Sequence, residues 1–214
     1  RLVTIDTRAF AYAGTADSLV EFGSGDLPVL IEIRARAFQE FKGDVRFVGT
    51  PFPNMEVLNI GAFRDVAGLN SQVDLVDHAE LQYIGEETFR NFARVHLGGL
   101  LPNLSTISKA AFDCEASVKA GSNKCEDSTV ELVDLPSLRT IGKGAFYYFY
   151  GRVKLAGALP VLEVLGRKSF SYCPNAAIRL DQGAPSLRCI GESAFKRKSF
   201  AEKGSLVLAG SFPC

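Results

Sequence analysis

The chain has 214 residues, of which 47% are hydrophobic and 22% are charged, a composition typical of a folded globular protein rather than a disordered segment. Lys plus Arg equals Asp plus Glu at 24 each, so net charge provides no long-range attraction to nucleic acid or to an anionic membrane. No apolar run reaches the roughly 18–20 residues of a membrane span, so we expect no direct membrane insertion by this segment.

A phenylalanine that follows a small residue recurs along the whole chain. The residue before it is Ala in six of eight units, and the position five before it is always Ile or Leu. Successive Phe residues lie between 23 positions (Phe89 to Phe112) and 34 positions (Phe112 to Phe146) apart. In chain order they are Phe10, Phe38, Phe63, Phe89, Phe112, Phe146, Phe170 and Phe195. This spacing predicts a repeat protein with units of about 25 residues.

Each unit is expected to contain two short extended segments. The first is an apolar pair separated by one residue, a pattern typical of a strand with one buried face. A turn that usually contains Pro follows, and then a second extended segment that ends at the recurring Ile or Leu. The predicted strands of the first kind are 20–22, 45–47, 73–75, 95–97, 130–132, 153–155, 178–180 and 206–208.

A unit of this size cannot bury an apolar face alone, so equivalent positions must stack between neighbouring units. We therefore expect a mainly β solenoid of about eight coils, with ladders of Phe, of Ile and of the strand pairs in its core. A residue that tolerates left-handed backbone often follows the Ile, which predicts a positive φ there. The residues concerned are Asp6, Asn59, Gly85, Gly142, Gly166 and Gly191.

The order V-x-L followed by P-x-L-x-x-I-G-x-x-A-F resembles the BspA-like leucine-rich repeats, also called the Treponema pallidum type. The second half of this pattern is clearest in LQYIGEETF from Leu81, LRTIGKGAF from Leu138, LEVLGRKSF from Leu162 and LRCIGESAF from Leu187. The resemblance implies a leucine-rich-repeat array with a parallel β-sheet on its concave face. It also implies a cell-surface protein, since proteins of this family are commonly surface-associated and some act in adhesion.

The repeats predict a single solenoid over residues 1–214. The one long interval, between Phe112 and Phe146, predicts a loop insertion at residues 113–129. Because the chain begins and ends in phase with the repeat and lacks an obvious polar cap, we expect it to be an excised part of a longer protein.

The inserted loop contains Cys114 and Cys125. One interpretation is a loop-closing disulfide between them, and the other is two free thiols. Cys173 occupies a position that is aromatic in other units, which favours a small buried apolar side chain there. A bridge between Cys173 and Cys189 stays open, and Cys214 is the candidate for pairing outside this segment.

The sequence contains no pattern that predicts catalysis, a cofactor or a metal site. Paired spacings such as C-x-x-C or H-x-x-x-H, which zinc sites need, are missing from the sequence. His78 and His96 occupy different repeat positions, so we expect no shared metal ion. Neither a P-loop nor a nucleophile elbow is present. The protein is therefore expected to be no enzyme and to bind no cofactor.

The residue between the members of each apolar pair should face the solvent. Stacking of the coils predicts that these residues form one stripe, which we interpret as a candidate ligand-binding surface. The alternative is an ordinary solvated face. Together with one flanking arginine, the stripe contains Arg46, Asp74, His96, Glu131, Arg152, Lys154 and Arg179, and its last three residues are basic.

The run AFYYFYG at residues 145–151 is a second candidate surface. Phe146 and Phe149 take ladder positions, which should leave Tyr147, Tyr148 and Tyr150 at least partly outward. Exposed tyrosines make effective binding hot spots because they bury much area at a low entropy cost. Packing against the inserted loop is the alternative interpretation.

The patterns themselves indicate a rigid repeat surface, and the resemblance implies a non-enzymatic module of a surface or secreted protein that binds a protein or a glycan in adhesion or recognition. Its partner is not expected to be nucleic acid, and the sequence specifies no oligomeric state. The alternative is an intracellular, cytoplasmic scaffold that joins protein partners and keeps its thiols reduced. Asn103 begins an Asn-Leu-Ser glycosylation sequon, which would agree with the extracellular setting.

Overall fold

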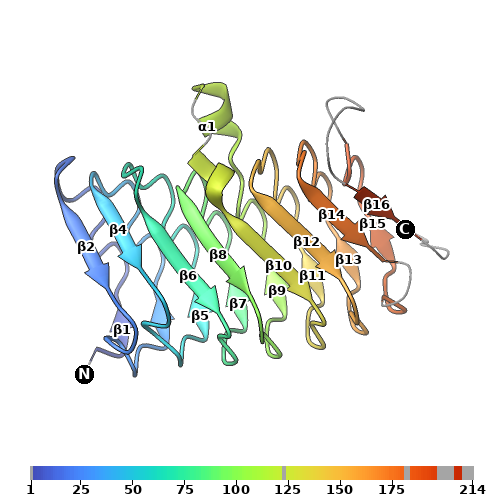
Figure 1. Cartoon of the computed structure of the whole chain (residues 1–214), viewed down its shortest axis with the longest axis horizontal. Helices are drawn as coiled ribbons and strands as arrows, with labels where there is room; N and C mark the ends of the chain where they lie inside the picture. The colour runs from blue at the N-terminus through green and yellow to red at the C-terminus, as the bar shows by residue number, and fades with distance from the viewer. Residues whose placement is uncertain (1, 122–123, 181–183, 197–204, 209–214) are drawn as a thin grey trace.

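The computed structural model of the chain is a mainly β parallel solenoid of about eight turns (Figure 1). It describes residues 2–121, 124–180, 184–196 and 205–208. Each turn contributes one strand to each of two eight-stranded parallel sheets. The solenoid predicted from the repeat is thereby confirmed. Below, coils 1 to 8 are numbered by the ladder Phe that each contains, from Phe10 to Phe195.

The two sheets differ in strand length, and we call the one with the longer strands the longer sheet. The longer strands carry the apolar pairs and are β2 Leu19–Phe22, β4 Asp44–Phe47, β6 Gln72–Val76, β8 Arg94–Gly98, β10 Thr129–Val133, β12 Arg152–Ala156, β14 Ala176–Arg179 and β16 Ser205–Val207. The two-residue strands carry the recurring Ile or Leu and are β1 Thr4–Ile5, β3 Glu32–Ile33, β5 Val57–Leu58, β7 Tyr83–Ile84, β9 Thr106–Ile107, β11 Thr140–Ile141, β13 Val164–Leu165 and β15 Cys189–Ile190.

The Ile and Phe ladders hold neighbouring coils in a fixed register. In the sheet of two-residue strands each recurring Ile or Leu pairs with its equivalent in the next coil, from Ile5 to Ile190. Successive ladder Phe rings stack with centroids 4.9 to 5.9 Å apart and interplanar angles of 3 to 20°. Burial of such stacked rings supplies much of the apolar area of the core, and the predicted Phe and Ile ladders are confirmed.

The prediction of a positive φ after the recurring Ile is wrong. The residues with positive φ lie two positions after the predicted ones, that is, three after the Ile or Leu. Examples are Glu87 (φ 55°), Gly144 (φ 61°) and Lys168 (φ 56°). A Cβ at Gly142 would lie only 2.6 Å from the backbone N of Lys109 in the preceding coil. Glycine at this position therefore permits close approach of two backbones rather than a special φ.

The longer sheet shifts its register at three places. Within pairs of coils, the apolar pairs of neighbouring strands lie side by side, as predicted. The pairing is offset by two residues between β4 and β6, between β8 and β10, and between β12 and β14. The pairs across these steps are Arg46 with Gln72, His96 with Thr129, and Lys154 with Ala177. Equivalent V-x-L residues are consequently not all neighbours.

Two buried serines complete the hydrogen bonding at the first two steps. The backbone N–H of Val45 donates to Ser71 Oγ, and that of Val95 donates to Ser128 Oγ, each at 3.0 Å. Both serines are almost fully buried. Since a buried N–H without a partner is costly, these hydroxyls stabilise the shifted register.

Within the predicted insertion, the described residues 113–121 and 124–128 project from one edge of the solenoid (Figure 1). They contain the short helix α1 Glu115–Lys119 and the 3₁₀ turn η1 Lys124–Asp127. Cys114 and Cys125 form a disulfide with their Cα atoms 6.5 Å apart, so the first of the two interpretations of these cysteines holds.

The projecting segment is also tied to earlier coils. Lys124 Nζ donates to the carbonyl oxygens of Val66 and Ala67, at 3.2 and 3.1 Å. The backbone N–H of Ser117 donates to Asn91 Oδ1 at 3.1 Å. These contacts hold the segment against coils 3 and 4.

Candidate functional site

The outer face of the longer sheet carries the predicted stripe, but its members do not form one row. The three register steps separate them, so the prediction of a continuous stripe is wrong. Direct neighbours are found only within pairs of coils, and these are Glu21 with Arg46, Asp74 with His96, Glu131 with Lys154, and Arg179 with Val207.

The first two of these pairs make polar contacts within the protein. Arg46 Nη1 lies 3.3 Å from Glu21 Oε2. The Asp74 carboxylate lies 3.0 Å from His96 Nδ1 and accepts a hydrogen bond of 2.7 Å from the Gly49 N–H. This half of the face therefore presents little unsatisfied charge to a ligand.

The other half of the face is more open. Arg152 and Lys154 are exposed on β12, and no ion pair or side-chain hydrogen bond involves either one within the described ranges. Lys154 and Glu131 border a hollow of about 400 Å³ next to Leu100. The Leu100 side chain is 73% exposed, which adds an apolar contact to a charged surface.

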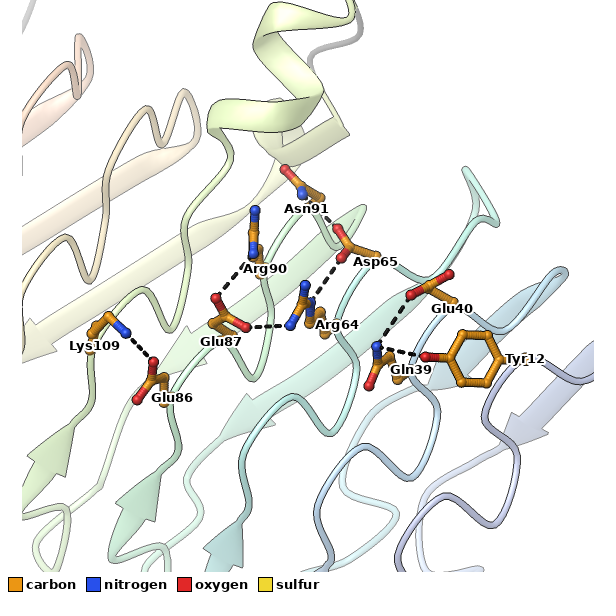
Figure 2. Close-up of polar contacts among 10 residues, drawn as sticks. All are labelled: Tyr12, Gln39, Glu40, Arg64, Asp65, Glu86, Glu87, Arg90, Asn91 and Lys109. Carbon is orange, nitrogen blue, oxygen red and sulfur yellow. Dashed lines mark hydrogen bonds and ion pairs between the residues drawn. The ribbon is translucent and has the colours of Figure 1, made fainter.

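A second surface is the bend edge, which we define as the residues from three before to two after each ladder Phe. Figure 2 shows a network of polar contacts along this edge in coils 3 and 4. Arg64 donates to Glu87 at 2.6 Å and to Asp65 at 3.0 Å, while Arg90 donates to Glu87 at 3.0 Å. Asn91 joins the network by donating to Asp65 at 2.6 Å.

Separate polar contacts lie on both sides of this network (Figure 2). Lys109 of coil 5 contacts Glu86 of coil 4. Toward the N-terminus, Gln39 Nε2 donates to Tyr12 Oη and to Glu40 Oε1, both at 3.2 Å. The cations Arg64, Arg90 and Lys109 of coils 3 to 5 thus each have a carboxylate partner at this edge.

The predicted tyrosines Tyr147 and Tyr148 lie on the same edge in coil 6, where they are half-buried. The Tyr148 ring stacks on Tyr172 of coil 7 at 4.6 Å and meets Tyr147 edge-on at 4.7 Å. Lys168 Nζ lies 5.0 Å above the Tyr147 ring, and Lys196 Nζ lies 5.9 Å above the Tyr172 ring. Tyr172 could have been found from the sequence, because its offset from its ladder Phe equals that of Tyr148.

The inserted segment also contacts this region. The backbone N–H of Cys114 donates to the Tyr147 carbonyl oxygen at 2.9 Å. Burial raises the pKa of Tyr147, and the nearby Glu115 carboxylate raises that pKa further. Tyr150 takes no part in the ring contacts of the tyrosine cluster, and its carbonyl accepts a hydrogen bond from Asn175.

Tyr147, Tyr148 and Tyr172 form the tyrosine cluster. A hollow of about 250 Å³ lies between this cluster and the inserted segment, and its lining includes Asp113, Lys143, Tyr147 and Lys168. Burial raises the pKa of Asp113 to about 6. Lys143 is exposed. Lys143 and Lys168 were not predicted from the sequence, because a single surface lysine cannot be recognised as part of a site before the stacking of the coils is known.

Within the described ranges, no group of three or more His, Cys, Asp or Glu side chains could hold a metal ion. His78 is buried in the core, whereas His96 lies at the face of the longer sheet. No helix in the described part of the chain is long and apolar enough to cross a membrane. Comparisons with family models, with curated proteins and with solved structures gave no match to this chain.

Proposed function

We propose that this protein is a non-enzymatic module that binds a protein or a glycan outside the cell, and that its coils are BspA-like leucine-rich repeats. The observation that carries the proposal is the open part of the longer sheet. There, Arg152 and Lys154 protrude without ion-pair partners in the described part of the chain. Their strand β12 is fixed by pairing with β10 and β14, so a ligand would meet a preorganised surface.

The chemistry of this surface suits recognition. Lys154 and Glu131 offer charges of opposite sign beside the exposed apolar side chain of Leu100. Interfaces between proteins commonly combine apolar contact with a polar, charged rim. Complementary charge then selects the partner and speeds the encounter.

An extracellular location is supported by the disulfide between Cys114 and Cys125. Disulfides persist in oxidising compartments and are rare where glutathione keeps thiols reduced. The thiol state in material from the native source separates this proposal from the alternative of an intracellular scaffold.

The test is binding of the purified chain to an array of glycans and extracellular-matrix proteins, with Arg152→Glu/Lys154→Glu as the variant. The wild type should bind at least one array member saturably, and the variant should bind it roughly tenfold or more weakly. Arg139→Glu/Arg188→Glu is the control, since it makes the same change in net charge beside the other sheet. Absence of saturable binding, or equal loss in both variants, would contradict the proposal.

A further inference from the structure

The pairing of the cations at the bend edge changes between coil 5 and coil 6. In coils 3 to 5 its cations Arg64, Arg90 and Lys109 each contact a carboxylate. In coils 6 to 8 there is one lysine per coil for which the described residues provide no carboxylate within ion-pair distance. These lysines are Lys143, Lys168 and Lys196.

The surroundings of these lysines do not neutralise them. The nearby carboxylates already have cations of their own, since Glu115 lies 2.7 Å from Lys119 and Glu192 lies 3.2 Å from Arg167. Two more acids line the hollow: Glu87 is paired with Arg64 and Arg90, and Asp113 is partly buried. The bend edge of coils 6 to 8 is therefore a locally cationic surface on a chain of zero net charge.

Tyrosine side chains accompany the cations. Tyr147, Tyr148 and Tyr172 hold one another through ring contacts of 4.6 to 5.9 Å. Because each of these rings is only half-buried, part of every ring stays available to a ligand. Mutual packing fixes the rings in advance, which lowers the entropy cost of binding.

We propose that the bend edge of coils 6 to 8 binds a linear acidic polysaccharide. Its carboxylate or sulfate groups lie against Lys143, Lys168 and Lys196, and its sugar rings and hydroxyls contact the tyrosine cluster. This assignment rests on the proposed binding function and gives it a ligand class at a second surface.

The combination of cations and aromatic rings favours a polysaccharide over an acidic peptide. Lys143, Lys168 and Lys196 lie at different offsets from their ladder Phe residues, so they do not form a regular ladder of charges. A sugar residue presents a flat ring face, which can pack on a tyrosine ring, together with anionic groups, which bind lysine. A chain of acidic amino acids offers the anionic groups without such a ring face.

The lining of the hollow agrees with a polar ligand. Apart from Tyr147, Ala110 and Gly144, all its lining residues are charged. The charged groups of these residues can bind the hydroxyls and anionic groups of a sugar in place of water. A volume of about 250 Å³ lies just below the usual range for drug-sized ligands, which suits one part of a longer chain lying along the edge.

The experiment is isothermal titration of the whole chain with defined probes at low and at physiological salt. Heparin supplies sulfates and carboxylates, polygalacturonate supplies carboxylates alone, neutral dextran is the blank, and poly-glutamate represents an acidic peptide. The test variant is Lys143→Glu/Lys168→Glu. Coil 4 has Glu86 and Glu87 at the same repeat positions, so the fold accommodates these residues.

Heparin or polygalacturonate should bind the wild type, and the affinity should fall as salt rises. The Lys143→Glu/Lys168→Glu variant should bind roughly tenfold or more weakly, while Arg139→Glu/Arg188→Glu, with the same change in net charge, keeps the wild-type affinity. Tyr148→Asn should also weaken binding. Coil 4 has Asn91 at that repeat position with a positive φ, so this variant preserves the backbone.

Three results would overturn the assignment. In the first, both charge-reversal variants lose affinity equally, which means that net charge alone attracts the probe. In the second, poly-glutamate binds better than either polysaccharide, which makes the edge a peptide site. In the third, no acidic polysaccharide binds, but the array of glycans and matrix proteins yields another ligand. The proposed binding function then stands, and only the assignment of an acidic polysaccharide is wrong. Failure of the array as well would remove both proposals.

Discussion

The imidazole ring of His78 lies 5.2 Å from the ring of Phe52 in the core of the solenoid. The equivalent position in coil 6 is Leu135, so an ionisable ring replaces an aliphatic side chain in an apolar column. His78 Nδ1 lies 3.0 Å from the Val76 carbonyl oxygen. Its Nε2 is buried and has no hydrogen-bond partner in the described part of the chain.

This arrangement makes the protein sensitive to acid. Burial lowers the pKa of His78 below its ordinary value of 6.5, so the unfolded chain binds a proton more readily than the folded chain. The contribution of His78 to stability is thus complete above about pH 6.5. It is lost as the pH falls toward the lowered pKa of the folded state.

His78→Leu should remove this acid sensitivity. It should also raise the free energy of unfolding at neutral pH by about 1 to 3 kcal/mol, since a buried unsatisfied nitrogen disappears. Urea unfolding at pH 5 and pH 7.5 measures both effects. His96→Gln serves as the control and should retain the acid loss, because His96 lies at the surface of the longer sheet. An unchanged loss of stability in His78→Leu would show that another group is responsible.

Asp113 should have the opposite pH dependence. Burial raises its pKa from 3.8 to about 6, so its contribution to stability is fully present below pH 3.8 and is lost as the pH rises through 6. Asp113→Asn keeps an oxygen that can accept the Glu115 N–H, now bonded at 2.8 Å. The variant should gain about 1 to 2 kcal/mol at pH 7.5 and little at pH 4.

Thermal unfolding at the two pH values measures this difference. Asp134→Asn is the matched control, because the exposed Asp134 carboxylate also accepts a backbone N–H, that of Ala158 at 2.7 Å. It should show no such gain. Loss of stability in Asp113→Asn at both pH values would instead mean that the charged carboxylate makes a favourable contact.

The Phe ladder should be most sensitive in its interior. Phe146 is fully buried and stacks between Phe112 at 4.9 Å and Phe170 at 5.1 Å. Phe146→Ala should therefore cost about 3 to 5 kcal/mol. Phe10 is only partly buried and stacks on Phe38 from one side, so Phe10→Ala should cost clearly less. Equal denaturation midpoints for the two variants would contradict the role of stacking on both faces.

The ladders were predictable because each repeats one residue type at one position. Phe146 and Ile141 could be placed in the core from the sequence because their equivalents recur in every coil. The register of the longer sheet could not, because the V-x-L motif looks the same in shifted and unshifted coils. The steps depend instead on single buried hydroxyls such as those of Ser71 and Ser128, which resemble ordinary loop serines in the sequence.

The surfaces were predictable only in part, for the same reason. Lys154 was found because it belongs to the strand motif, but its neighbour across the step is Ala177 rather than Arg179. Lys143 and Lys168 lie at different offsets from their ladder Phe residues, and the structure brings them to one hollow. Alignment by repeat position cannot reveal a cluster whose members differ in repeat position.

The disulfide should stabilise the inserted segment rather than the ladders. Cys114 and Cys125 are 11 positions apart, and closing a loop of that length contributes about 2 to 3 kcal/mol if the bond is unstrained. Cys114→Ser/Cys125→Ser should therefore increase amide hydrogen exchange in α1 and η1. The ladder strands should keep their protection, because their pairing does not involve the loop. If exchange rose equally along the whole solenoid, the disulfide would be shown to stabilise the ladders as well as the inserted segment.

The state of these two thiols in the native source tests the location of the protein. Mass spectrometry after alkylation, with and without reduction, should show Cys114 and Cys125 alkylated only after reduction. That result, together with a glycan on Asn103, would agree with a protein exposed to an oxidising compartment. Full alkylation of both residues before reduction would contradict the extracellular proposal, since a reducing compartment keeps such thiols free, and it would direct the search toward an intracellular partner.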